Sequence, residues 1–394
     1  MTGPLGGFER RVQGALEAAP SRIPVILGGC GTGRTWLAQR LRDRAGRGAA
    51  HYIDVERSAT TPERFLQAVT SSSPFAWRPV DKEGADKQPA TAREAFDSLL
   101  AFFDTARAPG GEPCTFILDE FLELRTFESF PGLRHVVRDL LEALSGSANR
   151  FVLTTRYVAR AHRILRDATP RFEVMHVPQM SAADVTDLLA PVFNGYEQIP
   201  TDDRDYLGRM VQALTDGRAA YVKALGEAMR QMNPALASSA TADPISALTA
   251  LMSEEGALNH WCRFCYELRL HRARGYGALK AILDILAEDE PLTLTEISIR
   301  LRRTPGSTKD YLSWLEDVDL VTSRQKRYSF TDPLLRLWVR LHCHPTPPTQ
   351  EDVAREVQRY ALARVPQQEP AALAYAGVDA TPEERKSWGI IEID

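Results

Sequence analysis

Short apolar runs alternate with longer amphipathic stretches in the first half of the chain. The runs predict strands at residues 23–27, 51–55, 115–120, 150–155 and 172–177. The stretches between them favour helices, among them 62–69 and 92–106. Strands that alternate with helices predict the fold class α/β, with a doubly wound parallel sheet.

The second half lacks this alternation. Residues 181–232 are expected to form a small bundle of helices, 233–244 a linker, and 254–276 one long helix. Three further helices begin at 279, 297 and 307, the second opened by a Thr293–Glu296 capping box and the third capped by Ser307 after a turn. Two short strands follow, at 320–322 and 328–330. This order predicts a winged helix-turn-helix.

A glycine-rich segment, residues 28–35, joins the first strand to the first helix of the predicted sheet. It fits G-x-x-x-x-G-K-[ST] at Gly28, Gly33 and Thr35, and Arg34 stands where Lys is usual. Glycines allow positive φ angles and a close approach of the backbone to a ligand, and the helix start adds positive charge. We therefore predict an ATP-binding phosphate loop.

Within this loop each residue receives an expected role. Thr35 offers a hydroxyl to Mg²⁺ and Arg34 a cation to the outer phosphates. The residues expected to contact the nucleotide are Gly28, Gly31, Gly33, Arg34, Thr35 and Trp36. Arg and Lys are not interchangeable, so Arg34 bears on hydrolysis more than on binding. The alternative is a glycine-rich turn that binds no ligand.

Two carboxylates, Asp119 and Glu120, end the strand that begins at Thr115. The carboxyl ends of parallel strands face the ligand crevice, so both side chains are expected beside the phosphate loop. Asp119 would hold Mg²⁺ through water, and Glu120 would position the attacking water. The alternative is that the pair caps the next segment.

Three segments together resemble the signal-transduction ATPases with numerous domains (STAND) and their archaeal-type ATPase relatives, which are related to AAA+ proteins. They are residues 28–35, residues 117–120, and the strand end Leu153-Thr154-Thr155-Arg156. The resemblance implies that Arg156 reads the γ-phosphate. Gly217-Arg218-Ala219 resembles the lid motif of these families with Ala in place of Pro, which makes Arg218 a second sensor candidate. Residues 331–338 resemble the segment that follows the wing in the archaeal-type proteins.

These patterns divide the chain into five expected parts. They are a P-loop domain at 1–178, a helical lid at 179–232, a linker and connecting helix at 233–275, a winged helix domain at 276–344, and a C-terminal helix and tail at 345–394.

Composition bounds the remaining choices. The chain has 394 residues, 44% hydrophobic and 25% charged, with a net charge of −4. No apolar stretch is long enough to span a membrane, and five thiols fit a reduced cytoplasmic protein. Cys262-x-x-Cys265 with Cys343 and its flanking histidines suggests zinc, but an i, i+3 pair inside a helix favours core thiols.

Three functions stay open. The first is a regulatory ATPase, a nucleotide-dependent switch that acts on a protein partner and can oligomerise on binding ATP. The second is a DNA-binding AAA+ ATPase of the replication or transposition type, and the third is a scaffold that binds nucleotide without hydrolysis. For DNA, the basic residues are Arg300, Arg302, Arg303, Arg324, Lys326 and Arg327, but the third helix is acidic. A GTPase is disfavoured because no Asn/Thr-Lys-x-Asp guanine motif follows a late strand.

Overall fold

The computed structural model describes residues 4–46, 48–77, 89–190, 200–232, 243–273 and 275–365. Part of the linker expected at 233–244, and the tail after 365, lie outside the described residues. In the described part of the chain no helix is both long and apolar enough to cross a membrane.

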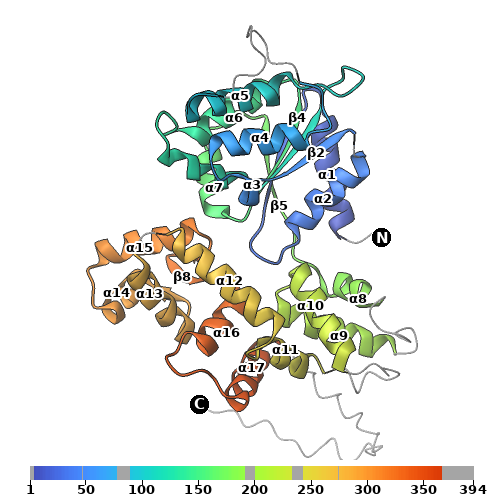
Figure 1. Ribbon diagram of the computed structural model, residues 1–394. Coiled ribbons are helices and arrows are strands. Elements are labelled where there is room, and N and C mark those ends of the chain that lie inside the picture. Colours follow the sequence, from blue (N-terminus) through green and yellow to red (C-terminus); the bar gives the residue numbers. More distant parts are fainter. Residues whose placement is uncertain are drawn as a thin grey trace, which may run out of the picture.

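The five predicted strands form one parallel sheet, which confirms the α/β fold class (Figure 1). The strands are β1 (Ile23–Leu27), β2 (Ala50–Asp54), β3 (Thr115–Asp119), β4 (Arg150–Thr155) and β5 (Phe172–His176), in the order β2-β3-β4-β1-β5. Strand β1 lies between β4, the central strand, and β5 at the edge. The loop after β1 therefore emerges at the carboxyl edge of the sheet, flanked by two strand ends.

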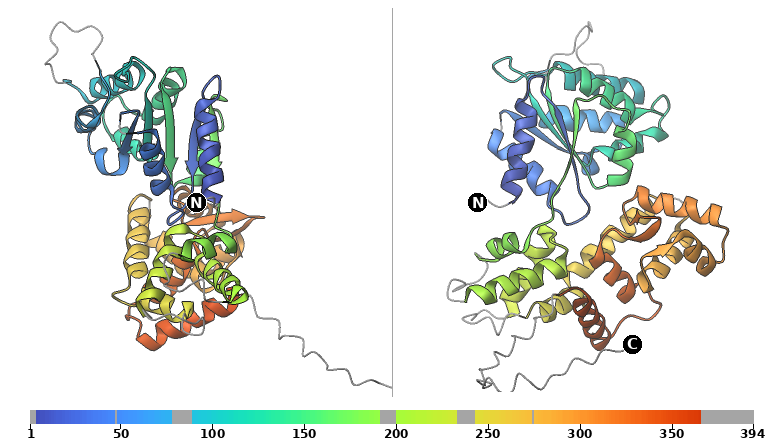
Figure 2. Two further views of the ribbon diagram at one scale, coloured as in Figure 1. Left: turned by 90° about the vertical axis from the view of Figure 1, so that its right-hand side faces the viewer. Right: turned by 180° about the vertical axis from the view of Figure 1, so that it is seen from behind.

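Helices cover both faces of this sheet (Figure 2). Successive side chains of a strand point to opposite faces, and the apolar side chains on each face pack against helices. On one face Ile26, Ile117 and Val152 pack with residues of α1 (Pro4–Glu17) and α2 (Arg34–Ala45). The neighbouring positions face a larger core made with α4 (Pro62–Ser72), α5 (Ala92–Thr105) and α6 (Val136–Gly146). The sequence pattern did not predict three short helices at the carboxyl edge, α3 (Val55–Ser58), η1 (Phe121–Ser129) and α7 (Val158–Leu165).

A bundle of helices follows the sheet. It contains α8 (Ala182–Leu189), α9 (Thr201–Thr215) and α10 (Ala219–Met232), as expected for the lid. The same core also takes in α11 (Pro244–Met252) and α17 (Gln350–Arg364). The C-terminal helix therefore packs on the helices that stand where the lid is expected, although 118 positions separate Met232 from Gln350.

The next segment corrects one prediction. In place of a single helix at 254–276, α12 (Ala257–His271) ends before Gly275, whose φ of 83° opens α13 (Tyr276–Glu288). Glycine allows this left-handed conformation without steric cost. The chain can therefore turn from α12 into the following unit.

The unit that follows has the element order of a winged helix-turn-helix. After α13 come β6 (Leu292–Thr293), α14 (Leu294–Leu301), α15 (Pro305–Asp317), β7 (Val321–Arg324), β8 (Arg327–Phe330) and α16 (Pro333–His342). The strands form an antiparallel sheet in the order β6-β8-β7. The Thr293–Glu296 capping box is present. The predicted Ser307 cap is wrong, because Thr304 caps α15 and Pro305 lies in its first turn.

The larger core of the sheet centres on Phe116 of β3, which is fully buried. Its ring centroid lies 5.2 Å from that of Phe75, 5.1 Å from Phe103 and 5.7 Å from Phe151. The pairs with Phe75 and Phe103 are edge-to-face and the pair with Phe151 is stacked. Aromatic pairs of these kinds add stability beyond the area that they bury.

We predict that Phe116→Ala lowers the free energy of unfolding by about 3–5 kcal/mol, because it opens a cavity among packed rings. Urea denaturation followed by circular dichroism measures this change. The matched control is Leu362→Ala, whose side chain is 68% exposed on α17. Equal midpoints for the two variants would contradict the central place of Phe116.

Candidate functional site

The glycine loop has the conformation that a phosphate site requires. Gly31 and Gly33 adopt φ angles of 77° and 91°. A Cβ built on Gly28 would lie 2.7 Å from Oγ1 of Thr32, so no larger residue fits there without a shift. The Thr32 hydroxyl donates to the carbonyl of Gly29 over 2.9 Å and closes the loop on itself.

The loop runs directly into the amino end of α2. Gly33 is the N-cap residue and supplies no side-chain hydrogen bond. The first N–H groups of a helix have no partner within the helix, so they are donors for an anion. Thr35 and Trp36 in this turn are exposed, Trp36 by 46%. The arrangement fits the phosphates of a nucleotide.

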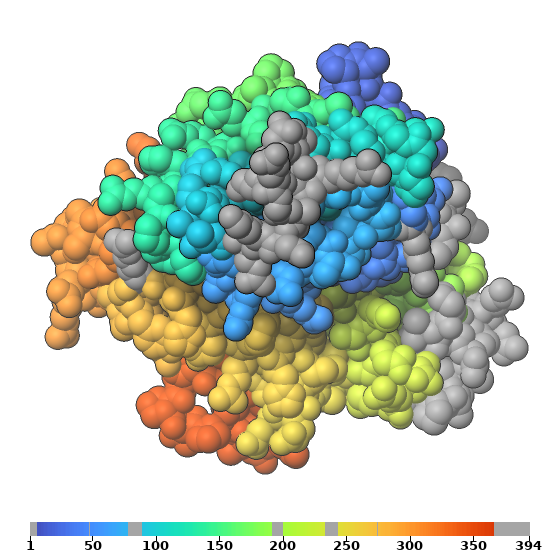
Figure 3. Space-filling model, turned by 45° about the horizontal axis from the view of Figure 1, so that its top comes forward, coloured from blue at the N-terminus to red at the C-terminus, as the bar shows by residue number. Residues whose placement is uncertain are grey.

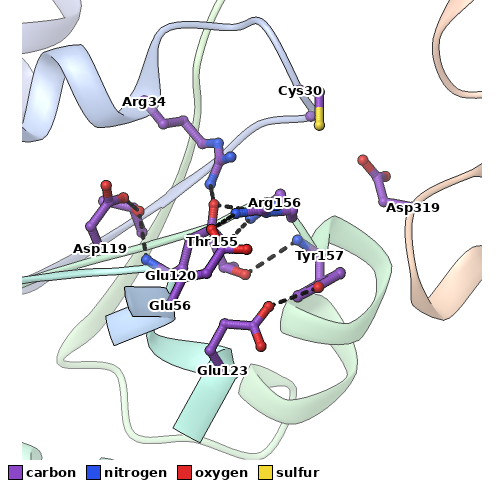
Figure 4. A network of polar contacts seen from close by, with 12 residues as sticks. Cys30, Arg34, Glu56, Asp119, Glu120, Glu123, Thr155, Arg156, Tyr157 and Asp319 are labelled. Atoms are coloured by element: carbon purple, nitrogen blue, oxygen red, sulfur yellow. Dashed lines mark hydrogen bonds and ion pairs between the residues drawn. The ribbon is translucent and has the colours of Figure 1, made fainter. Parts of the chain in front are cut away.

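Glu120 lies between two arginines, both of them predicted site residues (Figure 4). Its Oε1 is 2.6 Å from Nη1 of Arg34 and 3.1 Å from Nε of Arg156, and all three side chains are buried. Its Oε2 accepts the backbone N–H of Arg156 at 3.0 Å. The structure thus brings Arg34, Glu120 and Arg156 together at the carboxyl edge of the sheet.

These contacts decide the ionisation of Glu120. Burial raises the pKa of the carboxyl, but the charges of Arg34 and Arg156 and their hydrogen bonds outweigh burial and hold the pKa below its usual value. In this arrangement Glu120 is a fully engaged anion and a weak base. Its backbone is left-handed, with φ of 59°, and its N–H donates to the Thr154 hydroxyl at 3.2 Å.

Asp119 is buried at the end of β3 and held by two hydroxyl groups. The Tyr52 hydroxyl donates to Oδ2 at 2.7 Å, and the Thr154 hydroxyl donates to Oδ1. Neither Tyr52 nor Thr154 was assigned a role from the sequence. Thr154 stands near the end of a predicted strand, and this position was the available signal, because neighbouring parallel strands end at one edge; Tyr52 lies in the middle of β2 and has no such signal.

Arg156 has a second carboxylate partner, Glu56 of α3, which the sequence analysis also missed. Glu123 of η1 lies close by. It accepts a hydrogen bond of 2.8 Å from the Tyr157 hydroxyl and forms an ion pair with Arg272. Arg272 follows α12, so this acidic group reaches the C-terminal half of the chain. Neither α3 nor η1 was predicted, and their carboxylates could not be placed from sequence.

The lid candidate Arg218 lies against the loop. Its guanidinium donates to the carbonyls of Cys30 and Thr331, each at 2.7 Å, and pairs with Asp332 at 3.2 Å. The Tyr221 hydroxyl donates to the same Asp332 at 2.6 Å. Arg218 therefore joins the loop, the lid and the start of α16.

Asp319, between α15 and β7, also faces the loop (Figure 4). A Cβ on Gly29 would lie 3.3 Å from its Oδ2, and this buried oxygen has no hydrogen-bond partner. Burial raises the pKa of the carboxyl to about 7, although the charges of Arg269 and Arg218 oppose the shift. The Arg269 guanidinium donates to the Asp319 carbonyl at 2.6 Å.

A hollow of about 380 Å³ opens at the junction of the two halves. Glu123, Arg160, Arg272 and Trp314 are among the residues that line it, and no loop residue lines it. The candidate phosphate site, at the glycine loop, therefore lies outside this hollow.

Cys262 and Cys265 lie inside a helix, as expected, and both are buried. Within the described ranges, no group of three or more His, Cys, Asp or Glu side chains is arranged to hold a metal ion.

Comparison with solved structures identifies the fold. The Walker-type ATPase PABY2304 of Pyrococcus abyssi matches with a TM-score of 0.58 and 16% identity, over 84% of this chain and 94% of that one. ORC1 of Aeropyrum pernix, solved in complex with DNA, matches with a TM-score of 0.42 and 15% identity, over 90% and 91% of the two chains. A variant of RuvB from Thermotoga maritima matches with a TM-score of 0.43 and 13% identity, over 87% of this chain and 95% of that one.

The chain has the fold of the Pyrococcus protein. The match to the Pyrococcus protein carries this conclusion, because its TM-score is the one above 0.5 among the three. No family model matches the sequence, and no curated protein matches it.

We predict that Asp319→Asn stabilises the protein at neutral and alkaline pH. Because the folded pKa of about 7 lies above the unfolded value of about 3.9, the contribution of Asp319 is fully present below the unfolded pKa and is lost as the pH rises through 7. Asn keeps the shape and tolerates the left-handed backbone at φ 57°. The expected gain at about pH 8 is roughly 1–3 kcal/mol.

Urea denaturation at several pH values measures this gain. It should shrink as the pH falls from about 8 to about 5. Asp310→Asn, on the exposed side of α15, is the control and should change neither the midpoint nor its pH dependence. A gain for Asp319→Asn that does not vary with pH would show that the carboxyl is ionised throughout this range.

Proposed function

We propose that this protein is an ATP-binding regulatory ATPase, a nucleotide-dependent molecular switch. The uncapped glycine loop ends at an arginine that is paired with the candidate catalytic glutamate, and this observation carries the proposal. The fold supports it, since the Pyrococcus neighbour is described as a Walker-type ATPase.

The loop residues Gly28, Gly31 and Gly33 would hold the phosphates, with Trp36 exposed beside them. Thr35 and Asp119 are the proposed Mg²⁺ residues, and the two hydroxyl groups on Asp119 fix its orientation. When bound, ATP supplies the phosphoryl group for transfer, and Mg²⁺ neutralises part of its charge.

In the proposed switch these contacts of Glu120 correspond to a resting form. A base that positions water needs a carboxylate that is not already neutralised, and here Arg34 and Arg156 contact both of its oxygens. We assign Arg34 two alternative partners, Glu120 at rest and the outer phosphates when ATP is present. Release of Arg34 would remove one of the two cations on Oε1 and raise the basicity of Glu120, while Arg156, which would read the γ-phosphate, stays beside the carboxylate.

The lid and the winged unit would sense this change through the loop. Arg218, Tyr221 and Asp332 tie loop, lid and α16 together in one buried network. Arg163 of α7 pairs with Asp317 at the end of α15, so the acidic helix faces the sheet domain. These internal contacts favour coupling of nucleotide state to a protein partner, in the manner of STAND proteins, over groove reading by α15.

DNA is the second candidate partner, favoured by one observation. Arg302 and Arg303 after α14, and Arg324 and Lys326 in the wing, are all exposed. Such residues grip phosphates without reading sequence. Assembly into oligomers on ATP binding is compatible with either partner.

We predict that Thr35→Ala abolishes binding of Mg-ATP, while Thr35→Ser, which keeps the hydroxyl, retains it. Glu120→Gln should keep nucleotide binding within about tenfold of wild type, or about 1.4 kcal/mol, and stop turnover. Isothermal titration and a phosphate-release assay measure the two quantities. Circular dichroism shows whether each variant is folded.

Turnover by Glu120→Gln at the wild-type rate would remove the role of Glu120. Tight nucleotide binding without turnover in the wild-type protein, with and without DNA, would favour the scaffold. If the purified wild-type protein neither carries nor binds ATP or ADP, the switch itself is wrong.

For DNA, we predict that Arg324→Ala with Lys326→Ala weakens binding to duplex DNA equally for unrelated sequences. Removing two phosphate contacts should also lower the slope of log affinity against log salt by about 2. Fluorescence anisotropy at several salt concentrations measures both effects. If the wild-type protein shows no salt-dependent binding to duplex DNA, DNA is excluded as the partner and a protein partner remains.

A further inference from the structure

Cys30 of the phosphate loop lies against the face of α12, far away in sequence. Its sulfur is 3.2 Å from the sulfur of Cys265 and 2.8 Å from Nη2 of Arg269. Cys265 and Arg269 are four positions apart on α12 and therefore share one helix face. In the space-filling view, the α12 region borders directly on the sheet domain (Figure 3).

The surroundings favour a reactive thiolate at Cys30. The hydrogen bond from Cys265 and the charges of Arg269, Arg156 and Arg34 lower the pKa of the Cys30 thiol, and burial opposes them. Cys114 is the contrast within the same chain: burial raises its pKa to about 11. A thiolate is the form that attacks oxidants, and redox-sensitive cysteines combine a low pKa with a nearby resolving thiol and access to solvent. Cys30 keeps 9% of its surface exposed, which is the route for a small oxidant.

We propose that Cys30 and Cys265 are a site of reversible oxidation, at which a peroxide converts the two thiols into a disulfide that ties the phosphate loop to α12. The part of this inference that concerns ATP rests on the proposed function, and the disulfide itself does not.

The chemistry balances with hydrogen peroxide as the oxidant. The Cys30 thiolate attacks one peroxide oxygen, an S–O bond forms, the O–O bond breaks, and hydroxide leaves. Cys265 then attacks the sulfur of the sulfenic acid, the S–S bond forms, the S–O bond breaks, and water leaves with the Cys265 proton. Two thiols lose two electrons in total, and one peroxide gains them. Arg269 stabilises the thiolate before the first step.

The link would act on the loop directly. Cys30 lies between Gly29 and Gly31, and its carbonyl already accepts a hydrogen bond from Arg218 of the lid. A covalent bond would shorten the separation of the two sulfurs from 3.2 Å to about 2.05 Å, and so draw the loop backbone towards α12 and hold it away from its present conformation. The oxidised protein should therefore not load ATP until a dithiol reductant breaks the bond.

Trypsin distinguishes the two cysteines of α12, because Arg263 separates them. Full-length protein is treated with hydrogen peroxide, alkylated, digested without reductant and analysed by mass spectrometry. We predict a linked pair of residues 23–34 with residues 264–269. Cys262 would appear instead in residues 231–263. Reductant should abolish the linked pair and restore ATP loading.

Cys265→Ala should give no linked pair, and its reduced form should load ATP like the wild-type protein. The matched control Cys262→Ala, one turn earlier on α12, should keep the linked pair. A link through Cys262, a link between two copies, or a stable Cys30 sulfenic acid as the sole product would overturn the proposal. A linked pair in a protein that never loads ATP when reduced would refute the proposed function and leave the disulfide standing.

Discussion

The buried ion pair between Arg34 and Glu120 is the interaction on which the site depends. Removing two charges from water is costly, and a buried pair is sustained only where further hydrogen bonds satisfy it. Here Arg156 supplies both a guanidinium and a backbone N–H to the same carboxylate. Glu120 is thereby fixed at the end of β3, beside the loop, in a form that does not act as a base.

This pair also explains why Arg in place of Lys is compatible with the loop. A guanidinium has several donors in one plane and keeps its charge when buried, so it can hold a carboxylate at the site where a phosphate would be held. The residue that departs from the usual pattern is the residue that links the loop to the acidic strand end. Under the proposed function, the departure would therefore bear on regulation more than on the ability to bind an anion.

A second buried network connects this site to the rest of the chain. Arg218 and Arg269 come from the lid and from α12, and both reach the loop around Cys30. Asp332 and Asp319 complete the network from the winged unit. The glycine loop therefore contacts the lid helices, α12 and the winged unit directly. A change of the loop on nucleotide binding would reach these parts through adjacent side chains.

The sequence by itself determined the strands, the glycine loop and its helix, the acidic strand end and the order of elements in the winged unit. These features are local: an apolar run, a helix period or a turn residue specifies its own backbone. Tyr52, Glu56, Thr154 and Asp319 became visible only in the tertiary structure, and so did the partner of Arg34. Their contacts join residues distant in sequence, such as positions 34 and 120 or 30 and 265. The pattern of hydrophobic positions along the sequence does not predict such pairs. They arise from the order of the strands in the sheet and from the packing of the C-terminal half of the chain on the sheet domain.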